Sequence, residues 1–386
     1  MVSTRLLPLD LPPPFVFRHS TRQVIFGWGQ LDHVGALARG HGARRCALAI
    51  DEVFRDTDLH RRLTKVLGDA TGTVPTIYFV PAREPDIDVT NACHALFAET
   101  DPDMIVAIGG GSTMDAAKVA RMMLVNPGGA AAIAGFDVPH RPHPSLFVGV
   151  PTTSGTGSEV SEMAVIGQTG SDIKLRYRSE ALPFHVALLD PELTVSLPRG
   201  VTANTGFDAF THALEGYVSR SANLMTEPFS WNAMRLLHTW LPVAVEDPSH
   251  RAARCHCMIA SMQAAIAFNT SQLGLCHAIA APLGAMFHVA HGLANAIALP
   301  AVTAFNESWI GGKAPVIAEL LAAPTAAEGV ARFRSRVGLE IGLDSVVPDA
   351  MGRDALALAA MKSGNMAHNP RSARWEDVRA VVEAMR

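Results

Sequence analysis

MIVAIGGGSTMDAAKVARMM, at residues 104–123, passes from an apolar run through a glycine-rich turn into a helical pattern. The apolar run at 104–108 predicts a buried strand, and the periodicity of 115–123 predicts a helix. Between them, Gly110 and Gly111 carry no side chains, so backbone N–H groups near the positive end of the helix can approach a phosphate. This order of strand, turn and helix is typical of a parallel α/β sheet.

Apolar runs of the same kind lie on both sides of this stretch. They predict strands at 45–50, 76–80 and 147–150, a strand or hairpin at 17–26, and helices at 31–38 and 87–99, with a further helical pattern that ends at residue 67. Such alternation, with apolar strands, indicates a parallel sheet covered on both faces. From residue 204 onward the pattern is helical and rich in alanine and leucine. We therefore predict an α/β domain over residues 1–191 and an all-helical domain over residues 192–386.

Composition narrows the class of protein. The chain has 386 residues, enough for two domains with separate cores. Its net charge of −4, without blocks of like charge, does not indicate nucleic acid or a membrane surface as a partner. Apolar runs are too short to span a bilayer, and prolines stand where a signal peptide would have its apolar centre. Five irregularly spaced cysteines fit reduced thiols. We expect a cytoplasmic protein.

The sequence NTGFDAFTHALEG, at 204–216, places Asp208 and His212 four residues apart in a helical pattern. Side chains four apart project from one face of a helix, one turn from each other. Such a pair can bind one metal ion through two ligands, although Asp–His pairs at this spacing are more often surface hydrogen bonds. The pair therefore needs further ligands to indicate a metal site.

Two more histidines, His277 and His291, stand in GLCHAIAAPLGAMFHVAHGLAN at 274–295. Pro282 and Gly284 separate them, which predicts His277 near the end of one helix and His291 near the start of the next. Their neighbours are apolar or small, and an unpaired imidazole in such surroundings is costly. One carboxylate and three neutral imidazoles suit Fe²⁺ or Zn²⁺ and leave room for a substrate oxygen.

A nucleotide site is indicated more weakly. The GGGS turn lacks the full GxGxxG pattern, because Met114 stands at its last position. Asp51 follows the predicted strand at 45–50, where a carboxylate can accept hydrogen bonds from ribose hydroxyls and repel a 2′-phosphate. This favours NAD(H) over NADP(H), although Asp51 also suits the N-cap of the next helix. The small hydroxyl side chains at 152–158 form a second candidate loop for phosphate, ribose or nicotinamide.

Together these motifs resemble the iron-containing (group III) alcohol dehydrogenases, which share the dehydroquinate-synthase-like fold. The resemblance is carried by AIGGGSTMDAAK (107–118), PTTSGTGSEVS (151–161), DPELT (190–194), TGFDAFTHALEGYVS (205–219) and HAIAAPLGAMFHVAHGLANAIALP (277–300). It implies a Rossmann-like amino-terminal domain and an all-helical carboxy-terminal domain. A cleft between them would hold the nicotinamide against the metal.

The resemblance also implies roles for individual residues. The family's metal ligands fall on Asp208, His212, His277 and His291. Its cofactor contacts fall on Asp51, Gly110, Gly111, Ser112, Asp115, Thr152, Thr153, Thr156, Val165 and Lys174. The implied reaction is reversible hydride transfer between a primary alcohol and NAD(H), with Fe²⁺ or Zn²⁺ as Lewis acid. The family often forms dimers through its first strands, so we expect a homodimer.

One position departs from the family pattern. Many members have a third histidine four residues after His277, thought to carry the alcohol proton to solvent, whereas this chain has Ala281. We hypothesise that His288 or a chain of waters replaces it. The alternative for His288 is a histidine packed at a helix end. His288 is therefore a candidate catalytic residue, beside His277 and His291.

Alternative functions remain open at this level. One is a specialised reductase of an acidic aldehyde, such as a semialdehyde or phosphonoaldehyde. Another is an NAD- and metal-dependent lyase like dehydroquinate synthase, but a polyanionic substrate requires Lys and Arg around the metal, and the neighbours of the four ligands are mostly apolar. The side chains expected to form an apolar substrate pocket with one polar contact are Phe268, Met286, Phe287, Met163 and Asn269.

Overall fold

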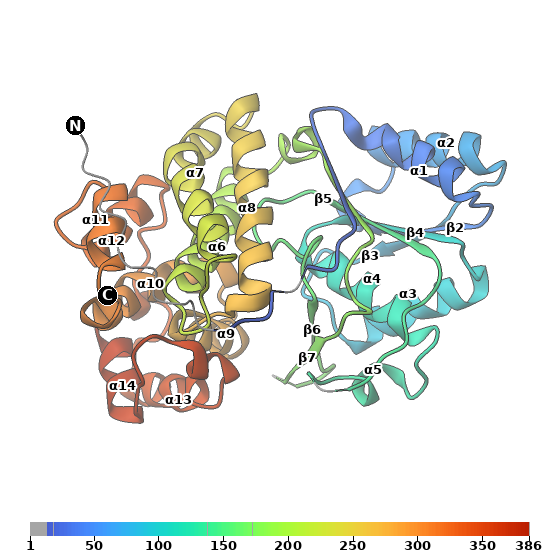
Figure 1. Ribbon diagram of the computed structural model, residues 1–386. Helices are drawn as coiled ribbons and strands as arrows, with labels where there is room; N and C mark the ends of the chain where they lie inside the picture. Colours follow the sequence, from blue (N-terminus) through green and yellow to red (C-terminus); the bar gives the residue numbers. More distant parts are fainter. Residues whose placement is uncertain (1–13, 18, 137, 172, 386) are drawn as a thin grey trace.

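The computed structural model describes residues 14–17, 19–136, 138–171 and 173–385, and its two halves differ in architecture (Figure 1). The first half contains a six-stranded sheet in the order β1-β8-β5-β4-β2-β3, and every pair of neighbours is parallel. The strands of this sheet are β1 (Gln23–Phe26), β2 (Cys46–Asp51), β3 (Thr76–Val80), β4 (Met104–Gly109), β5 (Leu146–Pro151) and β8 (Val186–Leu189). The predicted parallel sheet is confirmed.

Helices cover both faces of this sheet. In β2, Leu48 and Ile50 belong to the core beneath α1 (His33–His41) and α2 (Asp58–Thr71). Ala47 and Ala49 belong to the opposite core, beneath α3 (Ile87–Thr100) and α4 (Gly111–Met123). Successive side chains of a strand point to opposite faces, so an uninterrupted apolar strand is the pattern that two covered faces require. A short helix, α5 (Gly129–Ala132), completes this half.

Three strands are not predicted by the sequence pattern. β6 (Met163–Gly167) and β7 (Lys174–Arg178) pair with each other in an antiparallel two-stranded sheet, and β8 lies between β1 and β5 in the main sheet. β8 has only four residues, and β7 alternates basic and other residues, so neither has a distinctive apolar period. Their positions depend on pairing with distant parts of the chain.

The second half of the chain, from α6 to residue 385, is helical in the residues that the structure describes. The α-helices are α6 (Arg199–Val218), α7 (Glu227–Glu246), α8 (Arg251–Ser271), α9 (Leu275–Phe287), α10 (His291–Asn306), α11 (Lys313–Leu320), α12 (Ala326–Arg336), α13 (Ala350–Ala360) and α14 (Trp375–Glu383). Short 3-10 helices occur in both halves: η1 (Gln30–Asp32), η2 (Glu52–Phe54), η3 (Pro191–Thr194), η4 (Glu307–Trp309), η5 (Leu343–Ser345) and η6 (Gly364–His368). The predicted change from α/β to helical architecture is confirmed. Within the described residues, no helix has the length and apolarity needed to cross a bilayer.

The proposed division at residues 191 and 192 falls inside η3, between β8 and α6. The buried Asp190 accepts hydrogen bonds from the backbone N–H groups of Gly29, Leu31 and Glu192. This carboxylate therefore ties the start of the connection to the first helices of the chain. The two-domain division itself remains a prediction.

Several predicted boundaries are wrong. The strand or hairpin expected at 17–26 is reduced, among the described residues, to β1 at its end, which pairs with β8. α4 begins at Gly111, not at residue 115, with Gly110 as N-cap, so the glycine turn itself is the amino end of the helix. α9 continues through Pro282 and Gly284, which places His277 near the start of its helix. A proline interrupts one helical hydrogen bond, but α9 lies within the helical core, and this packing keeps the segment helical.

Candidate metal and nucleotide site

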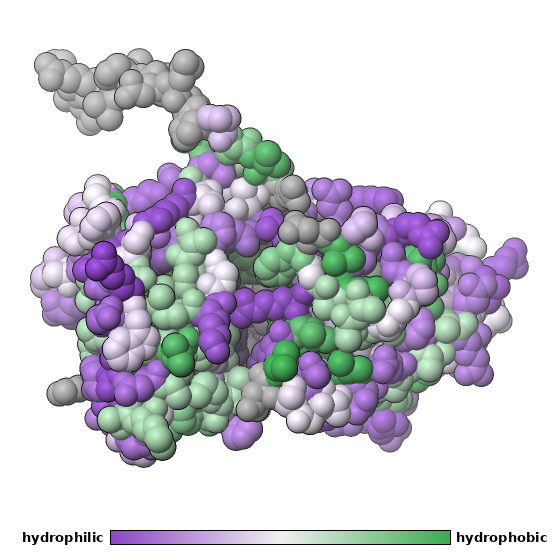
Figure 2. Space-filling model, turned by 90° about the horizontal axis from the view of Figure 1, so that it is seen from below, coloured by the Kyte–Doolittle hydropathy of each residue, from purple (hydrophilic) through white to green (hydrophobic). Residues whose placement is uncertain are grey.

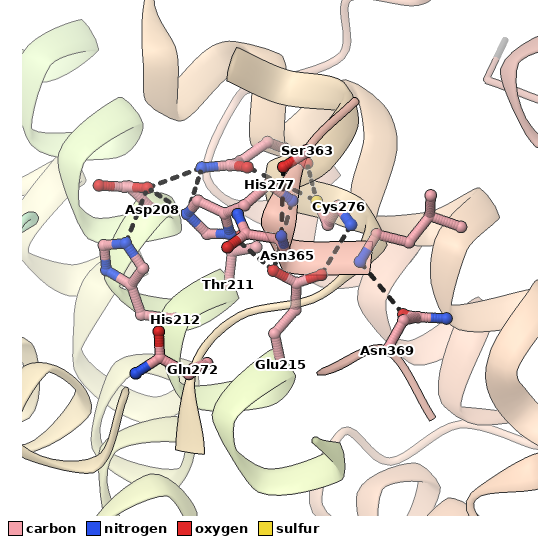
Figure 3. A network of polar contacts seen from close by, with 12 residues as sticks. Asp208, Thr211, His212, Glu215, Gln272, Cys276, His277, Ser363, Asn365 and Asn369 are labelled. Carbon is pink, nitrogen blue, oxygen red and sulfur yellow. Dashed lines mark hydrogen bonds and ion pairs between the residues drawn. The ribbon is translucent and has the colours of Figure 1, made fainter. Parts of the chain in front are cut away.

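The buried face of α6 presents three polar side chains one turn apart. Asp208, His212 and Glu215 follow each other at spacings of four and three residues, and each is at most 5% exposed. The ends of two other helices meet this face: His277 is the third residue of α9, and His291 is the first residue of α10. Three helices thus bring four predicted ligands and one unpredicted carboxylate together. Figure 3 shows Asp208, His212, His277 and Glu215 of this group.

The donor atoms converge on one carboxylate oxygen. Oδ1 of Asp208 lies 3.6 Å from Nε2 of His212, 3.6 Å from Nε2 of His277 and 3.5 Å from Nε2 of His291. A tetrahedral site with bonds of about 2.1 Å sets its ligand atoms about 3.4 Å apart, so these separations fit a first-row divalent ion. Asp208, His277 and His291 form a group whose donor atoms all lie within 4.8 Å of one another. His212 contacts Asp208 from outside that group.

Glu215 was not singled out by the sequence pattern. Its Oε2 accepts a hydrogen bond from Nδ1 of His277 at 2.6 Å, and its Oε1 accepts one from the backbone N–H of Cys276, also at 2.6 Å. With the proton on Nδ1, the lone pair of His277 is on Nε2, the atom that faces Asp208. The available signal was its position one turn beyond His212 on the same helical face.

Asn295 is a second residue that sequence reasoning missed. Its Nδ2 donates to Oδ1 of Asp208 at 2.7 Å and lies 3.3 Å from Nε2 of His277 and 3.4 Å from Nε2 of His291. Asn295 is fully buried and stands one turn after His291 on α10. Its amide therefore helps to orient the carboxylate on which the histidines converge. The spacing of four residues from His291 was the signal that could have indicated it.

The predicted nucleotide residues gather at one edge of the main sheet. Asp51 ends β2, Gly110 follows β4, and the loop from Thr152 follows β5, three neighbouring parallel strands. From β2 the chain continues to β3 on one side, whereas from β4 it continues to β5 on the other. Dinucleotides and other ligands of open α/β sheets bind at the carboxyl ends of strands where the direction reverses in this way.

The two candidate loops are in close contact. The backbone N–H of Thr152 donates to the carbonyl of Gly109 at 3.0 Å. A Cβ at Gly111 would come within 2.7 Å of Cγ2 of Thr156, and a Cβ at Gly110 within 3.5 Å of Cγ2 of Thr153. Glycine at 111 is therefore required by the packing of the loops. The amino end of α4, with partly exposed Ser112, is left open at the same edge.

Two family models match the chain over nearly its whole length. The model described as iron-containing alcohol dehydrogenase matches residues 21–191, and the model of the carboxy-terminal region of the Fe-containing alcohol dehydrogenase family matches residues 202–386. The chain belongs to the iron-containing alcohol dehydrogenase family. It is thus an oxidoreductase that acts on the CH–OH group of its donor and uses NAD and a metal.

Relatives of this dehydrogenase match it over more than nine-tenths of its length. The NAD-dependent methanol dehydrogenase of Bacillus methanolicus is 31% identical over 372 residues, which cover 93% of this chain and 97% of that protein. The 1,3-propanediol dehydrogenase of Klebsiella pneumoniae is 32% identical over 374 residues, which cover 92% and 95%. The solved structure of a 1,3-propanediol oxidoreductase is 29% identical, has a TM-score of 0.92, and covers 97% of this chain and 100% of that one. The expected family and fold class are confirmed.

The surroundings shift the pKa values of the four candidate ligands in different directions. Burial alone would raise the pKa of Asp208, but the neighbouring histidines hold this pKa well below its usual range. Burial lowers the pKa of His212 and that of His291. Burial also disfavours charge on His277, but hydrogen bonds with Asp208 and Glu215 outweigh it and raise the pKa of His277. The pKa shifts of Asp208, His212 and His291 thus favour the forms that bind a metal, whereas the raised pKa of His277 opposes metal binding at low pH.

The remaining cofactor candidates lie on and beside the β6–β7 hairpin. Asp115 accepts hydrogen bonds from Oγ of Ser158 at 2.7 Å and from the backbone N–H of Val165 at 2.9 Å. This carboxylate thus fixes the hairpin to α4. Lys174, the first residue of β7, forms an ion pair with Glu84 at 2.7 Å. The Lys174 ammonium would have to exchange this partner to bind a nucleotide.

The expected substrate contacts are only partly brought together. Phe268 packs against His212, with 4.7 Å between ring centroids, and shares a core cluster with partly buried Met163. Asn269 is not available to a substrate, because its amide accepts from the N–H of Glu162 and donates to the carbonyl of Val160. The prediction for Asn269 is therefore wrong, because the segment 160–162, far away in sequence, occupies its amide.

The other two expected pocket residues lie at the end of α9. Met286 is exposed, whereas Phe287 is partly buried against the helical core. His288 follows as the C-cap, with a left-handed backbone of φ 56° and an exposed side chain. His288 is therefore not packed into the protein. The alternative interpretation, a histidine packed at a helix end, required a buried side chain.

The open side of the metal site lies near His291. The side chain of His291 is 40% exposed, whereas those of His212 and His277 are at most 7% exposed. Figure 2 shows a hollow between the helical lobe on the left and the α/β lobe on the right, with hydrophilic side chains at its rim. Such a hollow gives small molecules access between the two lobes.

Proposed function

We propose that this dehydrogenase interconverts uncharged primary alcohols and their aldehydes, with NAD(H) preferred over NADP(H). A divalent ion, Fe²⁺ or alternatively Zn²⁺, is held by Asp208, His212, His277 and His291. The observation that carries this proposal is the convergence of three imidazole Nε2 atoms on Oδ1 of Asp208, at separations of 3.5 to 3.6 Å. A shared cation would satisfy the carboxylate and the three imidazole nitrogens together.

The chain's own residues prepare and shield the reaction. When bound, the cation supplies Lewis acidity at the substrate oxygen, and the nicotinamide exchanges the hydride. The backbone N–H groups at Gly110, Gly111 and Ser112 receive the pyrophosphate at the amino end of α4. Thr152, Thr153 and Thr156 supply hydroxyl groups beside them. Phe268 covers His212 and keeps water from that side of the site.

An uncharged substrate is favoured over an acidic aldehyde by the pairing of Lys174. Its ammonium lies 2.7 Å from Glu84, so the charge of Lys174 is already balanced before a substrate binds. The same pairing disfavours a dehydroquinate-synthase-like lyase, whose polyanionic substrate needs free basic groups.

The homodimer and the cytoplasmic location remain proposals. The exposed edge strand β1, with Val24 and Phe26 about two-fifths exposed, supports a dimer contact there.

The proposal is tested by anaerobic removal and replacement of the metal. The stripped protein is supplied with Fe²⁺ or Zn²⁺ separately, and NADH absorbance is followed with a panel of neutral and acidic aldehydes. NADH consumption that depends on metal and favours neutral aldehydes is the expected result. Binding of NADH without oxidation by any aldehyde in a broad panel would contradict the proposed reaction.

Replacing Asp51 with serine is expected to raise kcat/KM for NADPH relative to NADH by about tenfold or more. The carboxylate at the end of β2 repels a 2′-phosphate and binds ribose hydroxyls, and a tenfold change corresponds to about 1.4 kcal/mol. Serine retains the N-cap function, since Asp51 accepts a hydrogen bond from the N–H of Val53. The measurement is steady-state kinetics with both cofactors. An unchanged ratio with intact folding would assign Asp51 to capping alone.

Replacing His288 with asparagine is expected to remove one ionisation from the pH dependence of kcat for alcohol oxidation. We propose that the exposed imidazole of His288 passes the alcohol proton to solvent, because position 281 is alanine and not the histidine that many family members have there. Asparagine is chosen because it tolerates the left-handed backbone at φ 56°, where alanine would be strained. A pH profile identical to that of the wild type would remove His288 from the proton route.

A further inference from the structure

Glu215 makes three hydrogen bonds to one short segment of α9. Its Oε2 accepts from Nδ1 of His277 at 2.6 Å and from the backbone N–H of His277 at 3.3 Å. Its Oε1 accepts from the backbone N–H of Cys276 at 2.6 Å. Figure 3 shows Glu215 rising from α6 toward this segment, with His277 between it and Asp208. One buried carboxylate thus holds both the ring and the main chain of His277.

The contact with the ring selects one tautomer. A carboxylate only accepts hydrogen bonds, so the Nδ1 atom of His277 that lies against Glu215 carries the proton. The lone pair is then on Nε2, which lies 3.6 Å from Oδ1 of Asp208. Carboxylates placed in this way fix the orientation of metal-binding imidazoles and raise their basicity.

The contacts with the main chain fix the start of α9. Gly274, its N-cap, provides no side-chain hydrogen bond, so the first N–H groups of the helix depend on distant residues. Glu215 accepts hydrogen bonds from the backbone N–H groups of Cys276 and His277. Oδ1 of Asn369 accepts one from the backbone N–H of Leu275 at 3.1 Å. These two side chains share the task of anchoring the helix end, but only Glu215 touches the imidazole.

Charge indicates a cation as the remaining partner. Glu215 is 4% exposed, and no lysine or arginine in the described part of the chain forms an ion pair with it. When a metal binds Nε2 of His277, the ring is neutral, and a buried carboxylate beside a neutral imidazole is costly without another cation. Asp208 and Glu215 together carry two negative charges, which a divalent ion beside three neutral imidazoles would balance.

We propose that Glu215 is a positioning residue of the dehydrogenase, which holds His277 in its Nδ1-protonated tautomer and balances the charge of the divalent metal. This inference rests on the proposed function, because it requires the metal to bind at Asp208 and the three histidines. Glu215 acts through His277 and is not one of the proposed metal ligands.

The test compares Glu215→Gln with a matched control, Asn369→Ala. Glutamine keeps the shape of the side chain and still accepts hydrogen bonds, but it removes the charge. Asn369→Ala loosens the same helix end without touching the imidazole. Zn²⁺ affinity is measured by competition with a chelator, and NADH affinity and melting temperature serve as checks of folding. We expect Glu215→Gln to weaken Zn²⁺ binding about 10- to 100-fold, with NADH affinity unchanged. Asn369→Ala is expected to lower the melting temperature and leave Zn²⁺ affinity within about threefold.

A second measurement uses the wild-type protein alone. ¹⁵N NMR of the Zn²⁺-loaded protein is expected to show His277 protonated at Nδ1 and bound to metal through Nε2. Zinc bound through Nδ1, or equal losses of Zn²⁺ affinity in both variants, would overturn the role of Glu215. Wild-type Zn²⁺ affinity in Glu215→Gln would overturn this inference alone, whereas a wild-type protein that binds neither Zn²⁺ nor Fe²⁺ would overturn the proposed metal site as well.

Discussion

Replacing His277 with alanine is expected to lower kcat/KM for aldehyde reduction by about 10³-fold or more, which corresponds to about 4 kcal/mol of transition-state stabilisation. His277 lies at the centre of the site, with Asp208 on its Nε2 side and Glu215 on its Nδ1 side. Alanine removes one proposed ligand and leaves Glu215 without its closest partner. Both changes weaken metal binding, so added Fe²⁺ or Zn²⁺ is expected to restore little activity.

The nucleotide site provides the internal check for this variant. His277 belongs to the helical half, whereas the glycine turn and Asp51 belong to the α/β half, so NADH affinity is expected to stay at the wild-type level. His256→Ala is the matched control, because His256 lies on α8 and stacks on Trp240, away from the ligands. Steady-state kinetics and a metal assay of both variants make the comparison. Full activity in His277→Ala would contradict the proposed ligand set.

Replacing Gly292 with alanine is expected to destabilise the protein by about 3 kcal/mol and to abolish most of its activity. A Cβ at this position would lie 2.0 Å from the carbonyl oxygen of Asn204 and 2.6 Å from its carbonyl carbon. Both are backbone atoms of α6, so no change of side-chain rotamer relieves the clash. The start of α10 would have to move away from α6, and His291 would move with it, away from Asp208.

Denaturant unfolding and steady-state kinetics measure these two effects. Gly200→Ala is the control, since Gly200 also lies in the first turn of a helix, and a Cβ there would meet nothing within 4 Å. That substitution is expected to leave activity unchanged and stability unchanged or slightly increased. If Gly292→Ala were as stable and active as Gly200→Ala, the close approach of α10 to α6 would not be needed to position His291.

Much of the architecture can be predicted from periodicity. The run at 76–80 is β3 with the same bounds, and the stretch that begins at Met104 forms β4 and α4 around the glycine turn. These elements are predictable because a parallel sheet covered on both faces requires continuous apolar strands, and such runs are local in sequence. The four candidate ligands could be predicted because the spacing of Asp208 and His212 and the apolar surroundings of His277 and His291 are also local features.

Other features depended on partners that are far away in sequence. α9 remains helical through Pro282 because the surrounding core packs against it, which no local rule indicates. The amide of Asn269 is occupied by the backbone of residues 160–162, so it is not free for a substrate. Local sequence shows the type of side chain but not the group that it meets.

The sequence by itself determined the α/β and helical halves, the glycine turn, and the set of groups suited to a divalent metal. The tertiary structure alone decided which of these groups meet. It brings Nε2 of His291 within 3.5 Å of Asp208, and it places Glu215 and Asn295 against the ligands. The physical reason is that residue type and spacing specify donor chemistry and helical face, whereas the distances between atoms of different helices depend on how those helices pack.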